Sequence, residues 1–339
     1  MFMNNFIKIL AEKSHILADG ATGTNLFEMG LETGDPPEPW NVNHVDRIRA
    51  LHQGFVDAGS DLFLTNSFGG TSFRLKLHKF ENQVFELNKA AAIIGREVAD
   101  STERLVIVAG SMGPTGEMIE PHGLMTPQEA TAAFKAQAEG LVEGGVDVLW
   151  LETMYAIEEL EAAVDAIKDF GLPICATMSF DTAGKTMMGI TPANLAKRSQ
   201  ELGLIGFGAN CGVGAPDLLA TITDISRHVS DGTNVISKAN CGIPEYREGK
   251  IVYTGTKELM AQYVHLALNS GAKIVGGCCG TSFEHIRAMR KAMDEHQMNG
   301  MPSLMDIESK VGEMSSGSKA IFAGNDSAPI KTRRSRRSR

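Results

Sequence analysis

The sequence predicts an α/β protein of the (β/α)8 TIM barrel class, and three observations point to this fold. Eight short apolar segments rich in β-branched residues recur along the chain, and most precede a segment with helical periodicity. These segments are apolar almost throughout, as parallel strands buried on both faces must be. The 339 residues fit two ordinary domains or one large barrel. A doubly wound sheet is the alternative fold, but residues 19–24, DGATGT, lack its GxGxxG spacing.

The expected strands and helices alternate along the chain. The strands are expected at residues 15–22, 61–67, 104–111, 146–153, 173–180, 204–210, 234–240 and 272–279. The helices are expected at residues 46–58, 83–101, 127–143, 156–170, 192–202, 216–228, 256–270 and 282–297. Two helix starts carry a hydroxyl residue shortly before a carboxylate, with Thr126 ahead of Glu129 and Thr281 ahead of Glu284. In such a barrel, the residues that end the strands meet at one rim.

The chain is expected to form one barrel domain over residues 1–300, followed by an extension at 301–322 and a tail at 323–339. Part of the extension is expected to form a short helix that packs on the barrel. Gly, Ser, Asn, Pro and Arg dominate the tail, which predicts disorder. The tail carries a net charge of +5 and the rest of the chain −14, for a total of −9. So acidic a body predicts neither nucleic acid nor an anionic membrane as a partner.

Cysteine usage and the start of the chain indicate a cytoplasmic protein. An odd count of five cysteines, two of them adjacent, does not fit a disulfide framework and favours a reducing compartment. The opening MFMNNFIKILAEK is a short amphipathic stretch with charges inside it, unlike a secretory signal. The sequence contains no apolar run of 18 residues. A homo-oligomer is compatible with all of these features.

Three consecutive strand ends carry four of the five cysteines: Cys211, Cys241, Cys278 and Cys279. Thiolates from neighbouring strands suit Zn²⁺ at about 2.3 Å, and three protein ligands leave the fourth tetrahedral position open. The adjacent pair can share one metal only where the strand has ended and the backbone bends, which the flanking glycines permit. The third ligand is then Cys211 or Cys241, and spacing does not decide between them. Cys175, in the middle of a strand, is expected to be a small buried hydrophobe.

Several motifs together resemble the homocysteine S-methyltransferase family of zinc barrels, over roughly residues 14–297. The motifs are GANCG (208–212), GGCCG (276–280), DGATGT (19–24), LTNSFGG (64–70), GSMGPTGE (110–117) and LET (151–153). The resemblance implies that Cys211, Cys278 and Cys279 are the zinc ligands and that Cys241 is a bystander near the site. It also implies methyl transfer to L-homocysteine, which gives methionine.

Zinc held by three thiolates agrees with this activity on chemical grounds. A free thiol has a pKa of about 8.5, and zinc in an open site keeps a bound thiol ionised at neutral pH. Because the three protein ligands are themselves anionic, electron density stays on the incoming sulfur. The sulfur is then a nucleophile ready to accept a methyl group.

The resemblance also implies which residues bind homocysteine. An amino acid needs a carboxylate for its ammonium and hydrogen-bond donors for its carboxylate. Glu152 and Asp19 match family positions that face the amino group. The backbone N–H groups of Ala21 and Thr22 match those that hold the carboxylate. Taken alone, Asp19 could also be a turn or helix-cap residue.

The methyl donor is the least determined part of the prediction. Quaternary ammonium groups bind to aromatic faces, and Trp40 matches a tryptophan in the donor pocket of betaine–homocysteine methyltransferases. A loop tryptophan also packs over apolar surface by default. The chain is most similar to bacterial members of this group, so betaine is the first expected donor. Tyrosines of the animal enzymes correspond roughly to Gly69 and Thr153 here, so a different cage is needed, with Tyr155 or Phe68 as candidates.

Other functions stay open from the sequence. The methyl group could come from S-methylmethionine, dimethylsulfoniopropionate, or a folate or cobalamin carried on another protein. In a different class, Cys241 could complete a closed, structural four-cysteine zinc site without a substrate position. A further rival is a metal-independent barrel lyase or oxidoreductase that uses Glu152 and Asp19 as acid and base.

Overall fold

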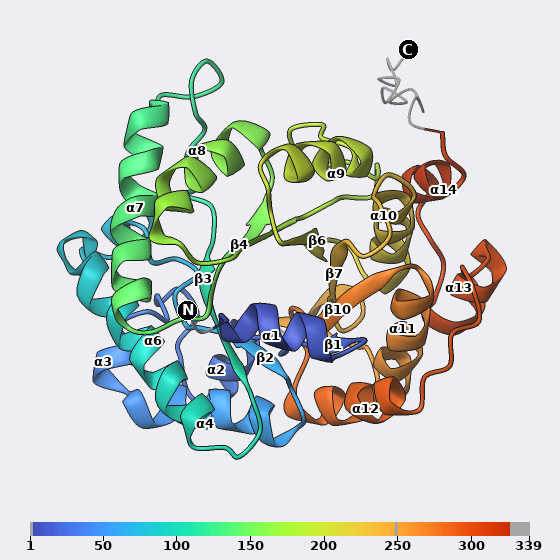
Figure 1. Cartoon of the computed structure of the whole chain (residues 1–339), viewed down its shortest axis with the longest axis horizontal. Coiled ribbons are helices and arrows are strands. Elements are labelled where there is room, and N and C mark those ends of the chain that lie inside the picture. Colours follow the sequence, from blue (N-terminus) through green and yellow to red (C-terminus); the bar gives the residue numbers. More distant parts are fainter. Residues whose placement is uncertain (1–2, 248–249, 326–339) are drawn as a thin grey trace, which may run out of the picture.

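The computed structural model describes residues 3–247 and 250–325. Eight parallel strands form one sheet in the order β1-β10-β7-β6-β5-β4-β3-β2, and helices surround it (Figure 1). The strands are β1 (Ile16–Leu17), β2 (Leu62–Leu64), β3 (Ile107–Met112), β4 (Val148–Met154), β5 (Ile174–Met178), β6 (Gly206–Cys211), β7 (Asn234–Ala239) and β10 (Ala272–Gly277). Each overlaps a predicted strand, and the predicted (β/α)8 barrel is confirmed.

Side-chain carboxylates help to close the barrel between β1 and β2. The N–H of Asp61 donates to the carbonyl oxygen of Leu17 at 2.7 Å. The Asp61 carboxylate in turn accepts from the N–H of Leu17 at 3.0 Å. Further along the seam, Oδ2 of Asp19 accepts from the N–H of Leu64 at 2.9 Å. Asp19 therefore connects β1 and β2 at the C-terminal ends of the two strands.

The outer helices follow the strands as predicted. They are α4 (Val45–Asp57), α6 (Val84–Asp100), α7 (Pro127–Glu143), α8 (Ile157–Ile167), α9 (Pro192–Glu201), α10 (Ala215–Arg227), α11 (Lys257–Asn269) and α12 (Phe283–Asp294). At α7 the predicted capping box of Thr126 and Glu129 is confirmed, because each side chain bonds the other residue's backbone N–H. At α12 the predicted start was wrong by one residue, since Ser282 is the N-cap and His285 completes the box.

Helix α1 (Asn5–Glu12) fills the N-terminal end of the barrel. Its buried residues Phe6, Ile9 and Leu10 join the cluster of inward-facing strand residues that includes Trp150 and Cys175. Cys175 is fully buried, as predicted for a small hydrophobe. The interior of the barrel at this end is therefore packed with apolar side chains.

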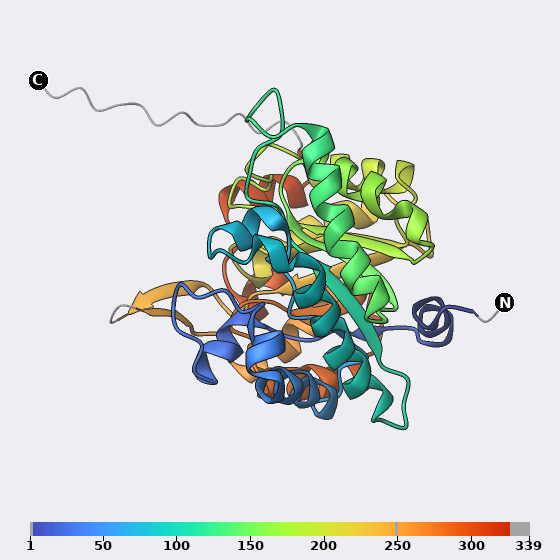
Figure 2. The same ribbon diagram turned by 90° about the vertical axis from the view of Figure 1, so that its left-hand side faces the viewer.

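The loops hold short elements that the sequence did not predict. The helical ones are α2 (Gly23–Glu28), α3 (Trp40–Asn43), α5 (Ser72–Lys76) and η1 (Glu81–Gln83). The 3-10 turn η2 (Lys168–Phe170) follows α8 directly and lies within the helix predicted at 156–170. A two-stranded hairpin of β8 (Pro244–Arg247) and β9 (Lys250–Tyr253) follows β7. Figure 2 shows this hairpin projecting at the end of the molecule opposite to α1.

The C-terminal extension contains two helices rather than the single short one predicted. Helix α13 (Leu304–Val311) packs against α11, and α14 (Ser316–Phe322) packs against α10. Residues 326–339, most of the predicted tail, lie outside the described residues. Within the described chain, no helix has both the length and the apolar character needed to cross a membrane.

Candidate active site

Three cysteine thiols converge where β6 and β10 end. Cys211 is the last residue of β6, and Cys278 and Cys279 directly follow β10. The three sulfur atoms lie within 4.8 Å of one another, with 4.0 Å between those of Cys211 and Cys279. Across the described residues this is the single group of at least three His, Cys, Asp or Glu side chains so close together. Cys241 stays outside it, because its thiol donates to the carbonyl oxygen of Gly255 at 3.3 Å.

Backbone geometry and a neighbouring asparagine hold the three thiols in place. Cys211 has a positive φ of 61°, a left-handed conformation that turns the chain where β6 ends. The N–H of Cys278 donates to the carbonyl oxygen of Ala239 at 2.7 Å. The N–H of Cys279 donates to Oδ1 of Asn240 at 3.1 Å. Both adjacent cysteines are thus anchored to the end of β7.

The thiols keep their protons at neutral pH while no cation is bound. The pKa of Cys211 is raised to about 11: its hydrogen bond with Cys278 lowers the pKa, but the bond with Cys279 and burial raise it more. The pKa of Cys279 is raised to about 12: the hydrogen bond with Cys211 lowers it, whereas Cys278 and burial raise it. A metal must displace these protons, so its binding is coupled to proton release.

The donor set fits Zn²⁺. Zinc–sulfur bonds of about 2.3 Å at tetrahedral angles place the sulfurs roughly 3.8 Å apart. The 4.0 Å between the sulfurs of Cys211 and Cys279 is close to this value. Soft thiolates select zinc over hard cations such as Mg²⁺. A metal here would also have a neighbouring hydrogen bond that orients a ligand, since Nδ2 of Asn210 lies 3.7 Å from the sulfur of Cys278.

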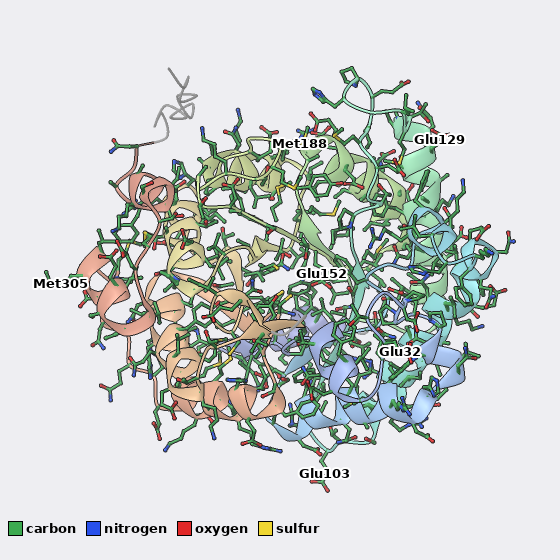
Figure 3. The ribbon with its side chains drawn as sticks, turned by 180° about the vertical axis from the view of Figure 1, so that it is seen from behind. Glu32, Glu103, Glu129, Glu152, Met188 and Met305 are labelled. Atoms are coloured by element: carbon green, nitrogen blue, oxygen red, sulfur yellow. The ribbon has the colours of Figure 1, made fainter. Side chains whose placement is uncertain are left out.

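Inward-facing polar side chains form a layer one strand position below the thiols. We call this set of Asp19, Ser111, Glu152, Asn210 and Lys238 the polar floor. Lys238 on β7 stands in register between Asn210 on β6 and Gly276 on β10, two residues before Cys278. Glu152 comes from β4 and accepts a hydrogen bond from the hydroxyl of Ser111 on β3. Figure 3 shows Glu152 near the centre of the ring of strands.

A buried ion pair dominates the electrostatics of the polar floor. Nζ of Lys238 lies 2.6 Å from Oδ1 of Asp19, and the two side chains are 3% and 1% exposed. Burial lowers the pKa of Lys238, but Asp19 and Glu152 raise it more, so the ammonium keeps its proton. Burial raises the pKa of Glu152, and the charge of Lys238 opposes this rise. Two carboxyl groups thus face one ammonium, and an incoming cation would complete the charge balance.

The other residues expected to bind substrate occupy different surroundings. The N–H of Ala21 already donates to the carbonyl oxygen of Thr281 at 3.0 Å. Thr22 is the N-cap of α2, and its own N–H has no partner among the described residues. Trp40 begins α3 and is 9% exposed. Its ring contacts His44, with 4.7 Å between centroids, and the guanidinium of Arg47 at 4.8 Å.

Sequence reasoning missed several residues of this region. Lys238 lies two positions after the inward-facing Ile236, and a lysine at an inward position of an apolar strand was a usable signal. Tyr253 comes from the hairpin, which had no clear signal. Its ring lies so close to Gly280 that a Cβ there would stand 2.4 Å from the tyrosine Cβ. Burial and the neighbouring Cys279 raise the pKa of the Tyr253 hydroxyl.

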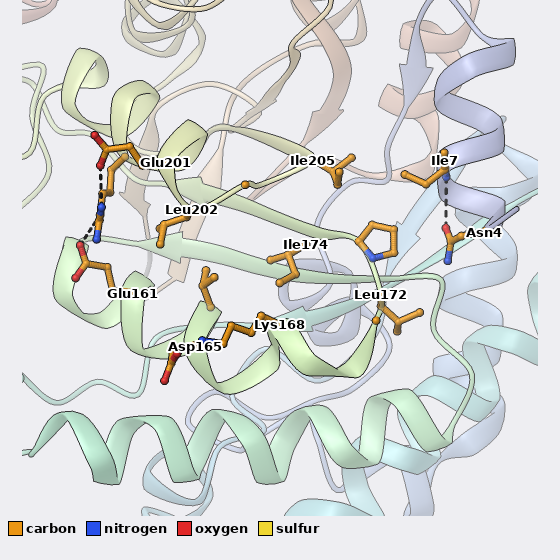
Figure 4. Close-up of a pocket in the computed structure, with 15 residues that line it drawn as sticks. Asn4, Ile7, Glu161, Asp165, Lys168, Leu172, Ile174, Glu201, Leu202 and Ile205 are labelled. Carbon is orange, nitrogen blue, oxygen red and sulfur yellow. Dashed lines mark hydrogen bonds and ion pairs between the residues drawn. The ribbon is translucent and has the colours of Figure 1, made fainter.

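A cavity of about 770 Å³ lies away from this site (Figure 4). The cavity is lined by the ends of α8 and α9, by η2 and by the segments that lead into β5 and β6, with Lys168, Leu172 and Leu202 among the lining residues, together with Asn4 and Ile7 at α1. Because α1 fills the N-terminal end of the barrel, this cavity belongs to the end opposite the thiols. It contains none of the candidate site residues.

Comparisons with known proteins identify the family of the chain. The homocysteine S-methyltransferase family model matches residues 16–293. The methionine synthase of Mycobacterium tuberculosis is 27% identical over 331 residues, which cover 91% of this chain and 27% of that protein. The chain therefore spans about a quarter of the length of that curated relative.

Solved structures share the fold. The oxidized form of the homocysteine methyltransferase MmuM from Escherichia coli has a TM-score of 0.72 at 21% identity, covering 85% of this chain and 99% of that one. Its metallated form has a TM-score of 0.71 at 20% identity, with the same two coverages. A methyltransferase from Methanosarcina mazei has a TM-score of 0.56 at 12% identity, covering 86% of this chain and 97% of that one. Because the family model spans most of the sequence, the chain belongs to the homocysteine S-methyltransferase family.

Proposed function

We propose that this protein catalyses the zinc-dependent transfer of a methyl group from a small onium donor, glycine betaine in the first place, to L-homocysteine. The observation that carries the proposal is the convergence of three thiols, from Cys211, Cys278 and Cys279, above the polar floor. Membership of the family supports homocysteine as the methyl acceptor. The products are methionine and, from betaine, dimethylglycine.

Cys211, Cys278 and Cys279 would hold the zinc ion. When bound, zinc lowers the pKa of the homocysteine thiol and supplies a thiolate at neutral pH. The side chain of Asn210 orients Cys278 through its amide and is itself fixed by Thr153, whose hydroxyl accepts from Nδ2 of Asn210 at 2.8 Å. A closed four-cysteine site has no support here, because the thiol of Cys241 is directed to Gly255.

Glu152 is the residue best placed to bind the ammonium of homocysteine. Its Oε1 accepts from Ser111, whereas its Oε2 has no hydrogen-bond partner among the described residues. Both oxygens of Asp19 are engaged, by Lys238 and by the N–H of Leu64. The free N–H of Thr22 is the better donor for the substrate carboxylate, since the N–H of Ala21 is already used.

The reaction is a displacement at the methyl carbon. The sulfur of homocysteine attacks this carbon, a sulfur–carbon bond forms, and the bond between carbon and the donor's onium atom breaks. The electron pair of the broken bond stays on the donor, which leaves as a neutral amine when the donor is betaine. An aromatic face binds the cationic donor, and the anionic ligand set keeps electron density on the attacking sulfur.

Methionine formation tests the proposal. Zinc-loaded protein is incubated with homocysteine and, in parallel, with betaine, dimethylsulfoniopropionate, S-methylmethionine or methyltetrahydrofolate. Betaine should give the fastest formation of methionine, and Cys278→Ala should give none. If methionine forms only with another donor, that compound replaces betaine as the proposed donor, and homocysteine remains the proposed acceptor. The absence of methionine with every donor would overturn the proposal.

A further inference from the structure

Lys238 is a fully buried cation inside the barrel, and the reaction as derived assigns it no task. Its ammonium forms an ion pair with Asp19, at 2.6 Å. The fold makes room for it, because a Cβ at Gly276 would stand 3.3 Å from Cγ of Lys238 and only 2.8 Å from Cβ of Ala18. A buried lysine is costly unless it is paired. Its presence in the layer below the thiols therefore calls for a function.

The two carboxyl groups of the polar floor are not equivalent. Asp19 has both oxygens occupied, one by Lys238 and one by the N–H of Leu64. Oε1 of Glu152 accepts a hydrogen bond from Ser111, and its Oε2 has no hydrogen-bond partner among the described residues. Among these residues, Lys238 forms its ion pair with Asp19 and none with Glu152. Lys238 thus neutralises one carboxylate and leaves the other available.

We propose that Lys238 is a positioning residue that makes Glu152 the ammonium-binding group of the site. This inference rests on the proposed function, because it takes the ligand to be homocysteine, an amino acid with a thiol. Burial raises the pKa of both carboxyl groups, and the charge of Lys238 opposes this rise at each, so Lys238 favours their ionised forms in a buried layer. Without it, two repelling carboxyl groups share that layer, and the uptake of a proton relieves their repulsion. The substrate ammonium would then lose the full negative charge that it needs.

The role predicts selectivity for ligands that carry an amino group. Homocysteine and 4-mercaptobutanoic acid share the thiol and the carboxylate, but only homocysteine has the ammonium. Zinc-loaded wild type should therefore bind homocysteine more tightly than 4-mercaptobutanoic acid. In Lys238→Met this preference should shrink by about tenfold or more, the scale of one charge-assisted hydrogen bond. The affinity for 4-mercaptobutanoic acid should stay within about twofold of wild type.

A double variant separates charge compensation from structural support. Asp19→Asn combined with Lys238→Met removes both members of the ion pair and leaves Glu152 as the single carboxylate of the polar floor. It should recover part of the preference for homocysteine that Lys238→Met loses, because the repulsion between Asp19 and Glu152 is gone while the direct effect of Lys238 on Glu152 stays absent. Because its floor contains no unpaired buried charge beyond Glu152, it also serves as the test if Lys238→Met fails to fold.

A matched control uses a partly buried ion pair elsewhere in the molecule, between Arg96 and Asp147. Nη1 of Arg96 lies 2.9 Å from Oδ2 of Asp147, just before β4 at the opposite end of the barrel. Arg96→Met should lower the Tm but change neither ligand's affinity. Calorimetric titration with each of the two thiols gives the Kd values, and zinc content and Tm are measured on every variant.

The outcomes distinguish this inference from the proposed function. Three results would overturn the role of Lys238 and leave the proposed function intact. In Lys238→Met, the affinities for homocysteine and 4-mercaptobutanoic acid could fall equally, or neither could change. In the double variant, the preference for homocysteine could fail to recover. Wild-type protein that binds no homocysteine would overturn the proposed function and this inference with it.

Discussion

Two identical tetrapeptides, ANCG at 209–212 and 239–242, end neighbouring strands but place their cysteines differently. Cys211 directs its thiol to Cys279, whereas Cys241 directs its thiol to Gly255. The difference arises from the β8–β9 hairpin that follows Cys241. The chain returns from it so closely that a Cβ at Gly255 would lie 2.5 Å from the carbonyl carbon of Cys241. Spacing along the sequence carries no trace of this contact, and so the residues alone left both cysteines as candidates.

Single cysteine substitutions test the thiol set. Cys278→Ala should abolish stoichiometric zinc binding and methionine formation, because two thiols remain where three are needed. Cys241→Ala should keep both properties. Cys175→Ala should also keep them, while lowering the free energy of unfolding by about 1 kcal/mol through a small cavity. Metal analysis and a methionine assay give the results. Zinc-dependent turnover retained by Cys278→Ala would contradict the site.

Trp40 tests the donor side. If its ring holds the onium group, Trp40→Ala should raise the KM for betaine by about tenfold and leave the KM for homocysteine unchanged, since a desolvated cation–π contact is worth roughly 1–2 kcal/mol. Trp40→Phe should have a KM for betaine between those of wild type and Trp40→Ala. Steady-state kinetics with each substrate varied in turn gives the values. A uniform loss of soluble protein would instead assign Trp40 to packing with His44 and Arg47.

Among the helices and strands, the sequence predicts those in which burial imposes a pattern of apolar residues. The outer helices have one buried face, so periodicity finds them, and most strand residues are apolar on both faces, so short apolar runs find the strands. β1 has two residues, which pair with β10, and the carboxylates of Asp61 and Asp19 bond the backbone along the seam with β2. The β8–β9 hairpin, which the sequence did not predict, projects from the barrel (Figure 2).

Helix α4 gives the protein a built-in sensitivity to acid. His52 on α4 stacks on Phe63, with 4.6 Å between ring centroids, and burial lowers its pKa to about 3. The native imidazole is neutral, so only the unfolded chain takes up a proton as the pH falls below about 6.5. Stability is therefore lost on acidification from about pH 6.5 towards 3, by about 1.4 kcal/mol per pH unit.

Urea denaturation between pH 7 and pH 4 measures this effect. As the pH falls, the free energy of unfolding of His52→Leu should decrease less steeply than that of wild type, by about 1.4 kcal/mol per pH unit. The exposed His78 provides the control, and His78→Leu should follow wild type. Parallel curves for wild type and His52→Leu would contradict the role of His52.

At the scale of the whole molecule, the barrel separates stability from chemistry along its axis. Helix α1 and apolar side chains fill one end, and the thiols with the polar floor occupy the other. The two helices of the C-terminal extension pack on α10 and α11 on the outside. The placement of the polar residues at one rim follows from the fold class, which the sequence predicted. The pairing of Lys238 with Asp19 follows from strand register, which periodicity does not show.

The central claim is that three thiols hold a zinc ion and leave one position for the thiol of homocysteine. X-ray absorption at the zinc edge tests it most directly, on zinc-loaded protein before and after addition of L-homocysteine. We expect three sulfur ligands without homocysteine and four with it, in wild type and in Cys241→Ala alike. Four sulfur ligands from the start, with no change when homocysteine is added, would contradict it, because the zinc site would then be closed.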